Sequence, residues 1–395
     1  MAIDFKSEAE ALDAELKNWR RDFHQHPELA FQEVRTSGIV TQVLNELELE
    51  VQTGIGKTGV VAILEGKYDG PTVLVRADMD ALPIQEDVQL DFVSQNTGVM
   101  HACGHDGHTA IALGVAKLFT KYRDELHGRI KFVFQPAEEI GQGARAMVTD
   151  GAMQDPVPDV SLGLHLWNSL PVGKVGVADG PTMAGALIFE VVLTGKGGHA
   201  ASPHMAIDPV VCAAQLVSAY QTIVSRNVDP FDTAVISVTS IKAGEGAYNV
   251  IPQTVRMVGT VRIFRTEVGE FVSKRMREIT ESLATAMGCK AEFKIDVMTR
   301  PVINDAETAQ KVRDSFLPIL PESDFEMGIR TMGAEDVSEF MSDVPGMYFF
   351  VGARDETADG YYGHHHPRFT IDEAALPLGV SLLSSAVAAY LLPES

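Results

Sequence analysis

The chain has 395 residues, 45% hydrophobic and 22% charged, and its 54 acidic and 32 basic side chains give a net charge of −22. This length predicts two domains, and the composition is typical of a globular chain with a sizeable core. Such an acidic chain is a poor partner for nucleic acid or anionic membranes, because both attract basic surfaces. The start of the chain lacks the pattern of a signal peptide, and three cysteines are too few for a disulfide scaffold. We therefore expect a cytoplasmic protein.

The first part of the chain alternates predicted strands and helices. A capping box at residues 7–10 predicts one helix that continues to Pro27. Strands are predicted at residues 60–64, 72–77, 129–135 and 160–166, with helices from His108 and from Gly143. This alternation predicts an α/β domain with a largely parallel sheet. Residues 54–59 fit the pattern GxGxxG, but a strand follows them instead of a helix, so we interpret them as a turn and not as a nucleotide-binding loop.

The order of predicted strands and helices changes after Pro181. The following elements are a strand at 187–194, a helix at 209–226, strands at 233–241 and 254–263, a helix at 266–287 and a strand at 291–297. This is the order of a ferredoxin-like α+β domain. We therefore expect such a domain at residues 182–296, inserted into an α/β domain of residues 1–181 and 297–395. An apolar strand at 347–351 and a buried helix from Asp372, too polar for a membrane span, complete the larger domain.

Metal-ligand residue types are concentrated at residues 101–108, where three histidines, a cysteine and an aspartate occur within eight residues. Thiolate and imidazole are common ligands of zinc and similar metals. The glycine between Cys103 and His105 lets both side chains face one point. The alternative interpretation is a polar loop with one buried cysteine.

Further candidate ligands follow other predicted strands. Glu138 and Glu139 stand at the carboxyl end of an apolar strand, where open α/β sheets bind their ligands. One carboxylate can bind metal while its neighbour handles a proton, although two solvated acids at a helix start would look the same. His165 ends a strand-like run, and His365 lies in a histidine-rich turn. Together these residues predict one multi-ligand metal site, and a thiol crowded by such ligands favours a metal thiolate over a cysteine nucleophile.

These segments and several others resemble the metal-dependent aminoacylase, hippurate hydrolase and indoleacetyl-amino-acid hydrolase group of the glutamate-carboxypeptidase-like metallopeptidase family. The resemblance covers essentially the whole chain. It implies a binuclear-metal aminopeptidase-like catalytic domain, with the inserted domain as a lid that also forms a dimer. The matching motifs lie at residues 23–28, 76–83, 101–108, 135–139, 197–200, 249–252, 333–336 and 365–367.

The resemblance also implies roles for single residues. Two divalent ions, Zn or Mn with Co or Ni as alternatives, would be bound by Cys103, His105, Glu139, His165 and His365, with Cys103 as the bridge. Glu138 would be the general base and acid, and Asp80 would orient the groups of the metal site. His199 would stabilise the reacting carbonyl in the active site of a partner subunit. The substrate would be bound by Asn249, Arg262 and Gly333, the first two holding its carboxylate. Asp78 stands near the place where many relatives have a histidine ligand, and this difference leaves the identity of the metal open.

The implied function is hydrolysis of N-acyl-L-amino acids, hippurate included, by a homodimer, with a tetramer as the alternative. Two rival interpretations stay open. One is a dipeptidase or carboxypeptidase that uses the same site. The other is an inactive metal-binding protein, which would have no use for Glu138 as a proton-transfer group beside a metal ligand.

Overall fold

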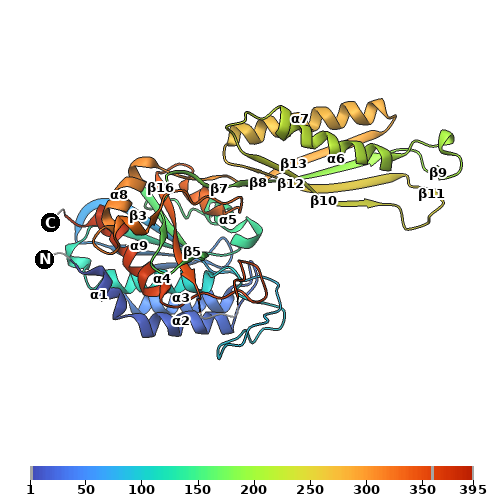
Figure 1. Ribbon diagram of the computed structural model, residues 1–395. Helices are drawn as coiled ribbons and strands as arrows, with labels where there is room; N and C mark the ends of the chain where they lie inside the picture. Colours follow the sequence, from blue (N-terminus) through green and yellow to red (C-terminus); the bar gives the residue numbers. More distant parts are fainter. Residues whose placement is uncertain (1–2, 357–359, 394–395) are drawn as a thin grey trace. The chain divides into compact units, whose positions relative to one another are not determined.

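The computed structural model describes residues 3–356 and 360–393, which form two compact units (Figure 1). The larger unit, here called the α/β unit, comprises the chain up to residue 182, residues 303–330 and the chain from 336 on. The smaller one, the insertion unit, comprises residues 183–302 and 331–335. It extends six residues beyond the end expected from the sequence, at 296, and includes a short return segment. The chain crosses between the units in β7 (Gly180–Met183) and β14 (Val302–Asn304).

The α/β unit is built on an eight-stranded sheet in the order β1-β2-β4-β3-β5-β16-β6-β15. β3 pairs in parallel with β4 and β5, and β5 pairs in parallel with β16, whereas β1, β2 and β4 are antiparallel neighbours. The sheet is thus mixed but rich in parallel pairs, which confirms the α/β class. Its strands are β1 (Glu50–Ile55), β2 (Gly59–Glu65), β3 (Tyr68–Asp78), β4 (His127–Gln135), β5 (Val160–Pro171), β6 (Val175–Gly176), β15 (Phe325–Glu326) and β16 (Gly346–Arg354). Its helices are α1 (Phe5–Glu10), α2 (Asp13–Gln25), α3 (Val34–Glu46), α4 (His105–Thr120), α5 (Gly143–Thr149), α8 (Ala306–Phe316) and α9 (Ala375–Leu391), with short 3₁₀ turns at Arg123–Glu125, Glu138–Ile140, Glu322–Asp324 and Asp336–Met341.

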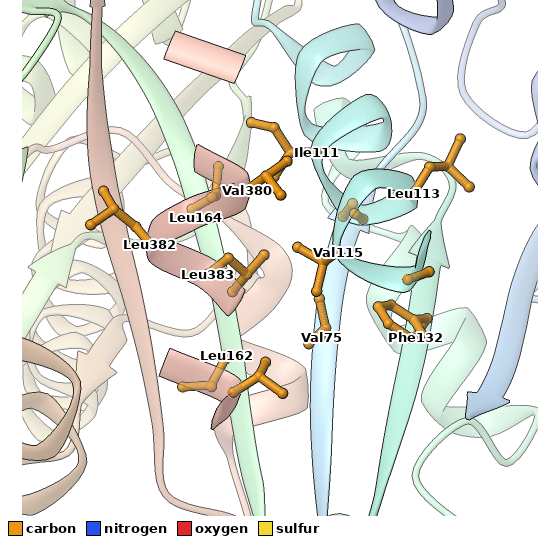
Figure 2. Close-up of a cluster of buried hydrophobic side chains, with 14 of the residues drawn as sticks. Val75, Ile111, Leu113, Val115, Phe132, Leu162, Leu164, Val380, Leu382 and Leu383 are labelled. Carbon is orange, nitrogen blue, oxygen red and sulfur yellow. The ribbon is translucent and has the colours of Figure 1, made fainter. Parts of the chain in front are cut away.

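The core of this unit lies between one face of the sheet and the helices α4 and α9. Alternate residues of the strands, such as Val75 and Leu162, face Val115 of α4 and Leu383 of α9 (Figure 2). Each of these side chains is at most 1% exposed, and burying one contributes about 1.5–3 kcal/mol. The burial of α9 explains its apolar sequence and confirms the predicted terminal helix. Within the described part of the chain, no helix combines the length and the hydropathy that a membrane span requires.

Two features at the amino-terminal end differ from the expectations. Ser7 lies inside α1, and Asp4 is the capping residue, because its carboxylate accepts a hydrogen bond from the Ser7 N–H at 3.1 Å. The single expected helix is therefore two helices, α1 and α2. Helix α3 was not predicted, since its threonine, serine, glycine and β-branched residues have low helix propensity. The burial of Val40 and Leu44 against the core stabilises it instead.

The insertion unit has a four-stranded antiparallel sheet in the order β10-β12-β8-β13 (Figure 1). Its buried hydrophobic residues form a core of its own. Its element order is the expected strand–helix–strand–strand–helix–strand, and its role as a lid stays a prediction. The elements are β8 (Gly185–Thr194), β9 (Gly198–His199), the 3₁₀ turn Pro203–Met205, α6 (Pro209–Arg226), β10 (Ala234–Ala243), β11 (Val250–Ile251), β12 (Thr254–Ile263), α7 (Thr266–Ala286) and β13 (Lys290–Thr299). β9 and β11 form a separate two-stranded ribbon.

Candidate metal centre

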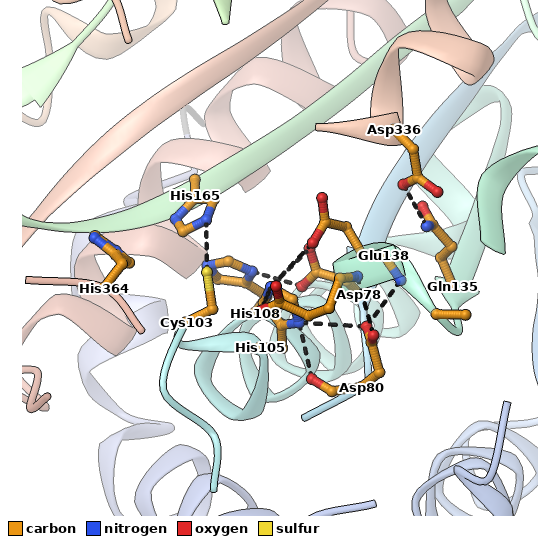
Figure 3. Close-up of polar contacts among 12 residues, drawn as sticks. Asp78, Asp80, Cys103, His105, His108, Gln135, Glu138, His165, Asp336 and His364 are labelled. Carbon is orange, nitrogen blue, oxygen red and sulfur yellow. Dashed lines mark hydrogen bonds and ion pairs between the residues drawn. The ribbon is translucent and has the colours of Figure 1, made fainter. Parts of the chain in front are cut away.

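The site lies at the carboxyl ends of parallel strands in the α/β unit (Figure 3). Asp78 ends β3, and Glu138 follows β4 in the 3₁₀ turn Glu138–Ile140. His165 lies in β5, and His105 is the first residue of α4. Gly104 precedes α4 with a φ of 95°, a left-handed conformation that glycine adopts without steric cost. Because parallel strands end at the same edge of a sheet, segments far apart in the sequence deliver their side chains to one place.

All five predicted metal ligands lie together in this place. Cys103, His105 and His165 offer ligand atoms within 4.8 Å of one another, and so do Cys103, Glu139 and His365. The Cys103 Sγ lies 3.6 Å from the His165 Nε2, and the Glu139 Oε2 lies 3.3 Å from the His365 Nε2. Cys103 is the residue common to both groups, which is the arrangement that a bridging ligand between two ions requires.

The chemistry of these atoms fits divalent cations. His105 Nε2 and Glu139 Oε1 are buried, and neither has a hydrogen-bond partner among the described residues. Buried polar atoms in proteins nearly always have partners, so two orphaned acceptor atoms in one cluster point to a bound cation. A donor set of thiolate, imidazole and carboxylate suits zinc and its transition-metal neighbours.

The protonation equilibria of the cluster support the same conclusion. Burial raises the pKa of the Cys103 thiol well above its usual range and raises the pKa of Glu139 to about 7. Burial also lowers the pKa of His165 well below its usual range, so that its imidazole is neutral, the form that binds metal. A divalent cation stabilises the deprotonated thiol and carboxyl groups, and binding therefore releases protons.

Asp80 organises the segment that carries the two glutamates. Its carboxylate oxygens accept hydrogen bonds from the backbone N–H groups of Glu138 at 3.0 Å and Glu139 at 3.1 Å. Its backbone carbonyl accepts a hydrogen bond from the His105 Nδ1 at 2.9 Å. Burial opposes protonation of His105, but the charge of Asp78 raises its pKa well above the usual range. With the Nδ1 proton held by Asp80, a bound cation would displace the proton from Nε2 and accept its lone pair.

The sequence pattern did not reveal the roles of His108 and Arg76. The Nδ1 of His108 donates to the Asp78 Oδ1 at 2.6 Å, and its Nε2 accepts the Leu166 N–H at 2.8 Å, so both ring nitrogens are engaged. Arg76 Nη1 donates to the Asp78 Oδ2 at 2.7 Å. Burial opposes ionisation of Asp78, but His105 and Arg76 hold its pKa well below its usual range. The only indication of these roles in the sequence is that Arg76 and His108 lie within the motifs at 76–83 and 101–108.

The remaining predicted site residues belong to the insertion unit and occupy three parts of it. His199 is exposed in β9 and pairs with Val250 of β11, and the neighbouring Asn249 accepts a backbone hydrogen bond from Ala200 at 2.9 Å. Arg262 is half-buried near the end of β12, and burial lowers the pKa of its guanidinium. Gly333 lies in the return segment, where its carbonyl accepts the Ala184 N–H.

Known proteins are similar to this chain in sequence and in fold. Residues 74–389 match the family described as Peptidase family M20/M25/M40. An N-acetylcysteine deacetylase of Bacillus subtilis (strain 168) is 42% identical over 93% of this chain and 94% of its own. An N-acyl-L-amino acid amidohydrolase of Geobacillus stearothermophilus is 46% identical over 76% of this chain and 81% of its own. The crystal structure of a Bacillus subtilis protein described as a dinuclear metal binding peptidase from the M20 family superimposes with a TM-score of 0.83. It is 38% identical, and the match covers 96% of this chain and 99% of that one.

The fold and the cluster thus define a protein of the α/β class with a candidate site for metal ions. The chain belongs to peptidase family M20/M25/M40. It is a metal-dependent, amide-cleaving hydrolase of that family.

Proposed function

We propose that this protein removes the acyl group from N-acyl-L-amino acids, hippurate included, and releases a carboxylic acid and a free amino acid. The observation that carries the proposal is the position of the Cys103 Sγ, which is shared by the group of Cys103, His105 and His165 and the group of Cys103, Glu139 and His365. Two divalent ions would be bound by Cys103, His105, Glu139, His165 and His365. Zn and Mn are the preferred candidates for this mixed donor set, with Co and Ni next.

The chemistry that the metal ions supply when bound is Lewis-acid activation of water and of the scissile carbonyl. Glu138 takes a proton from the attacking water and returns it to the leaving amine, a role worth about 10²–10⁴ in rate. Asp80 keeps Glu138 and Glu139 in place through their backbone N–H groups. Each carboxylate can then serve a separate purpose, Glu139 in binding metal and Glu138 in moving the proton.

The insertion unit would supply the contacts to the rest of the substrate. The Nδ1 of His199 accepts the Ala201 N–H at 3.1 Å, so a neutral ring carries its proton on Nε2 and can donate it to the developing oxyanion. Arg262, whose burial disfavours its charge, gains from a carboxylate partner, and we assign it with Asn249 and Gly333 to the substrate. We further propose that the protein is cytoplasmic and a homodimer, or a tetramer built from such dimers, in which His199 serves the site of the partner subunit.

A metal-depletion experiment tests the proposed function. The protein is treated with a chelator, reloaded with Zn, Mn, Co or Ni singly, and assayed on hippurate, N-acetyl-methionine and an unblocked dipeptide. We expect activity to return with at least one metal on the two acylated substrates and not on the dipeptide. Preferential turnover of the dipeptide would instead identify a peptidase, and turnover of none would identify a metal-binding protein without this activity.

A variant control links the activity to the cluster. Cys103→Ala removes a ligand shared by these two groups, so we expect it to lose bound metal and activity. Mutation of residues that only support metal ligands costs about 10–100-fold, so the loss of a shared ligand should cost about 100-fold or more. Cys212→Ala is the matched control, because Cys212 is a buried cysteine in the core of the insertion unit. Full metal content and a near-normal rate in Cys103→Ala would contradict the binuclear assignment.

A further inference from the structure

A buried glutamate outside the proposed metal site contacts the segment that carries Glu138. Glu33, which is 0% exposed, precedes α3. Its Oε1 accepts hydrogen bonds from the backbone N–H of Ala137 at 2.8 Å and of Phe31 at 3.0 Å. Its Oε2 accepts a hydrogen bond from the Thr58 Oγ1 at 2.6 Å. With three donors the carboxylate is fixed in one orientation, and it presents one oxygen to the residue just before Glu138.

Ala137 is held in an unusual backbone conformation. Its φ is 54°, in the left-handed region that residues other than glycine avoid at a cost of about 1–2 kcal/mol. This conformation turns the chain from the end of β4 into the 3₁₀ turn of Glu138 and Glu139. Its hydrogen bond to Glu33 therefore opposes a strain that would otherwise relax. Loss of the acceptor would leave a buried N–H unsatisfied, which costs about 1–3 kcal/mol and is comparable with that strain.

Carboxylates thus hold three consecutive backbone N–H groups. Glu33 accepts from Ala137, and Asp80 accepts from Glu138 and Glu139. Asp80 alone fixes the two glutamates but not the residue whose φ determines their direction. The two acids approach the turn from different segments, since Asp80 follows β3 and Glu33 precedes α3. The backbone of the turn that carries Glu138 is thus bound by both acids.

The glycine-rich turn at residues 54–59 fixes Glu33 in place. Thr58 donates to the Glu33 carboxylate, and the Lys57 Nζ lies 3.8 Å from the centre of the Phe31 ring. Gly56 in turn donates its N–H to the Asp150 carboxylate at 2.8 Å. The turn at 54–59, whose sequence matches GxGxxG, thus contacts the segment 31–33 through Thr58 and Lys57.

We propose that Glu33 is a positioning residue for the hydrolytic reaction: by holding the Ala137 N–H, it keeps the turn that directs Glu138 to the reacting water and Glu139 to the metal. This inference rests on the proposed roles of Glu138 and Glu139. Glu33 itself needs no contact with substrate or metal, and its effect passes through the backbone of Ala137. Displacement of a catalytic group by about 1 Å can cost about 100-fold in rate, so a small rotation of this turn is sufficient.

The test compares substitutions at Glu33 with one at Glu28. Glu33→Gln keeps an oxygen for both N–H donors, and its amide can donate to the Thr58 hydroxyl. Glu33→Met has a similar size but no comparable acceptor. Glu28→Met is the matched control, because the Glu28 carboxylate also accepts two backbone N–H groups, of Arg35 and Thr36, and none from the 136–139 turn. Each protein is measured for Tm, metal content, kcat and KM at saturating metal.

We expect Glu33→Met to lower kcat about 10- to 100-fold, with KM within threefold of wild type and weaker retention of metal. Glu33→Gln should keep kcat within threefold, and Glu28→Met should lower the Tm but keep kcat within threefold. Equal damage in Glu33→Gln and Glu33→Met, or equal loss of kcat in Glu28→Met, would overturn the proposal. If Glu33→Met does not fold, Glu33→Asp, one methylene too short to hold all three donors, replaces it with the same expectation.

Glu138→Gln, assayed in parallel, separates this inference from the proposed function. If Glu138→Gln lowers kcat while a folded, metal-loaded Glu33→Met does not, the positioning role of Glu33 is wrong and the proposed function stands. If Glu138→Gln keeps full activity, the proposed role of Glu138 is wrong, and the role of Glu33 falls with it.

Discussion

At the scale of single residues, Glu138 and Glu139 are neighbours in sequence with different proposed roles, proton transfer and metal binding. Both backbone N–H groups are bound by Asp80, so neither side chain needs to stabilise the turn. The Glu139 carboxylate lies 3.3 Å from His365 and belongs to a group of potential ligands with Cys103. The Glu138 side chain is 10% exposed, and its Oε2 lies 3.9 Å from the His105 Nε2.

Replacing each glutamate by glutamine should therefore produce two distinct defects. Glu138→Gln should retain bound metal and lower kcat about 100-fold or more, since only proton transfer is lost. Glu139→Gln should weaken metal affinity, and excess metal should restore part of its activity. Metal titration and steady-state kinetics of both variants check this. Identical behaviour of the two would contradict the division of roles.

At the scale of elements, a buried polar network connects α2 with the first turn of α4. Asp106, the second residue of α4, accepts hydrogen bonds from Arg20 at 3.1 Å and from the His24 Nδ1 at 2.8 Å. The His24 Nε2 donates to Glu86 at 3.0 Å. This network holds the end of the helix that carries His105, and a carboxylate at a helix amino terminus is also stabilised by the helix dipole.

The network predicts a pH-dependent contribution to stability. Burial would lower the pKa of His24, but its hydrogen bonds with Asp106 and Glu86 outweigh that effect and raise it above the ordinary value of 6.5. A raised histidine pKa stabilises the fold fully below the unfolded pKa of about 6.5, and this contribution is lost as the pH rises through the higher folded pKa.

Urea unfolding of wild type and His24→Gln across pH 6–9 measures this contribution, because titrations common to both proteins cancel in the difference. We expect the advantage of wild type in the free energy of unfolding to be largest at pH 6 and to shrink as the pH rises through the folded pKa of His24. A difference that stays constant, or grows with pH, would show that His24 is neutral throughout.

At the scale of the whole molecule, the proposed role of His199 connects the insertion unit with catalysis. His199 lies in the β9–β11 ribbon, apart in sequence from every proposed metal ligand. In a twofold dimer, a residue that serves the partner's site creates two equivalent composite sites, each drawn from both chains.

Mixing two inactive variants tests that arrangement. His199→Ala and Glu138→Gln dimers should each be nearly inactive, since each lacks an effect worth about 10²-fold or more. After subunit exchange, half of the dimers are mixed, and each mixed dimer has one intact site and one doubly damaged site. Activity should therefore approach about 25% of wild type. If exchange is demonstrated independently and activity stays at the sum of the two variants, His199 acts within its own chain or not at all.

The sequence by itself determined the class of fold and the candidate ligands, because both depend on local patterns. Alternating strands and helices predict the α/β unit, and the strand–helix order of residues 187–297 predicts the insertion. Cys103 with His105, and Glu138 with Glu139, stand close together in the chain, so their residue types reveal a metal site before any folding is considered.

Only the tertiary structure showed which packing contacts and long-range hydrogen bonds hold these elements and candidate ligands in place. Helix α3 contains many residues of low helix propensity, and its stability depends on the packing of Val40 and Leu44 against the core. Glu33 and Ala137 are 104 residues apart, and nothing in either segment predicts their hydrogen bond. His108 looks like a ligand in its motif, yet contacts from Asp78 and Leu166 occupy both of its ring nitrogens. Long-range hydrogen bonds of this kind arise where strand ends and loops converge, and no local periodicity encodes them.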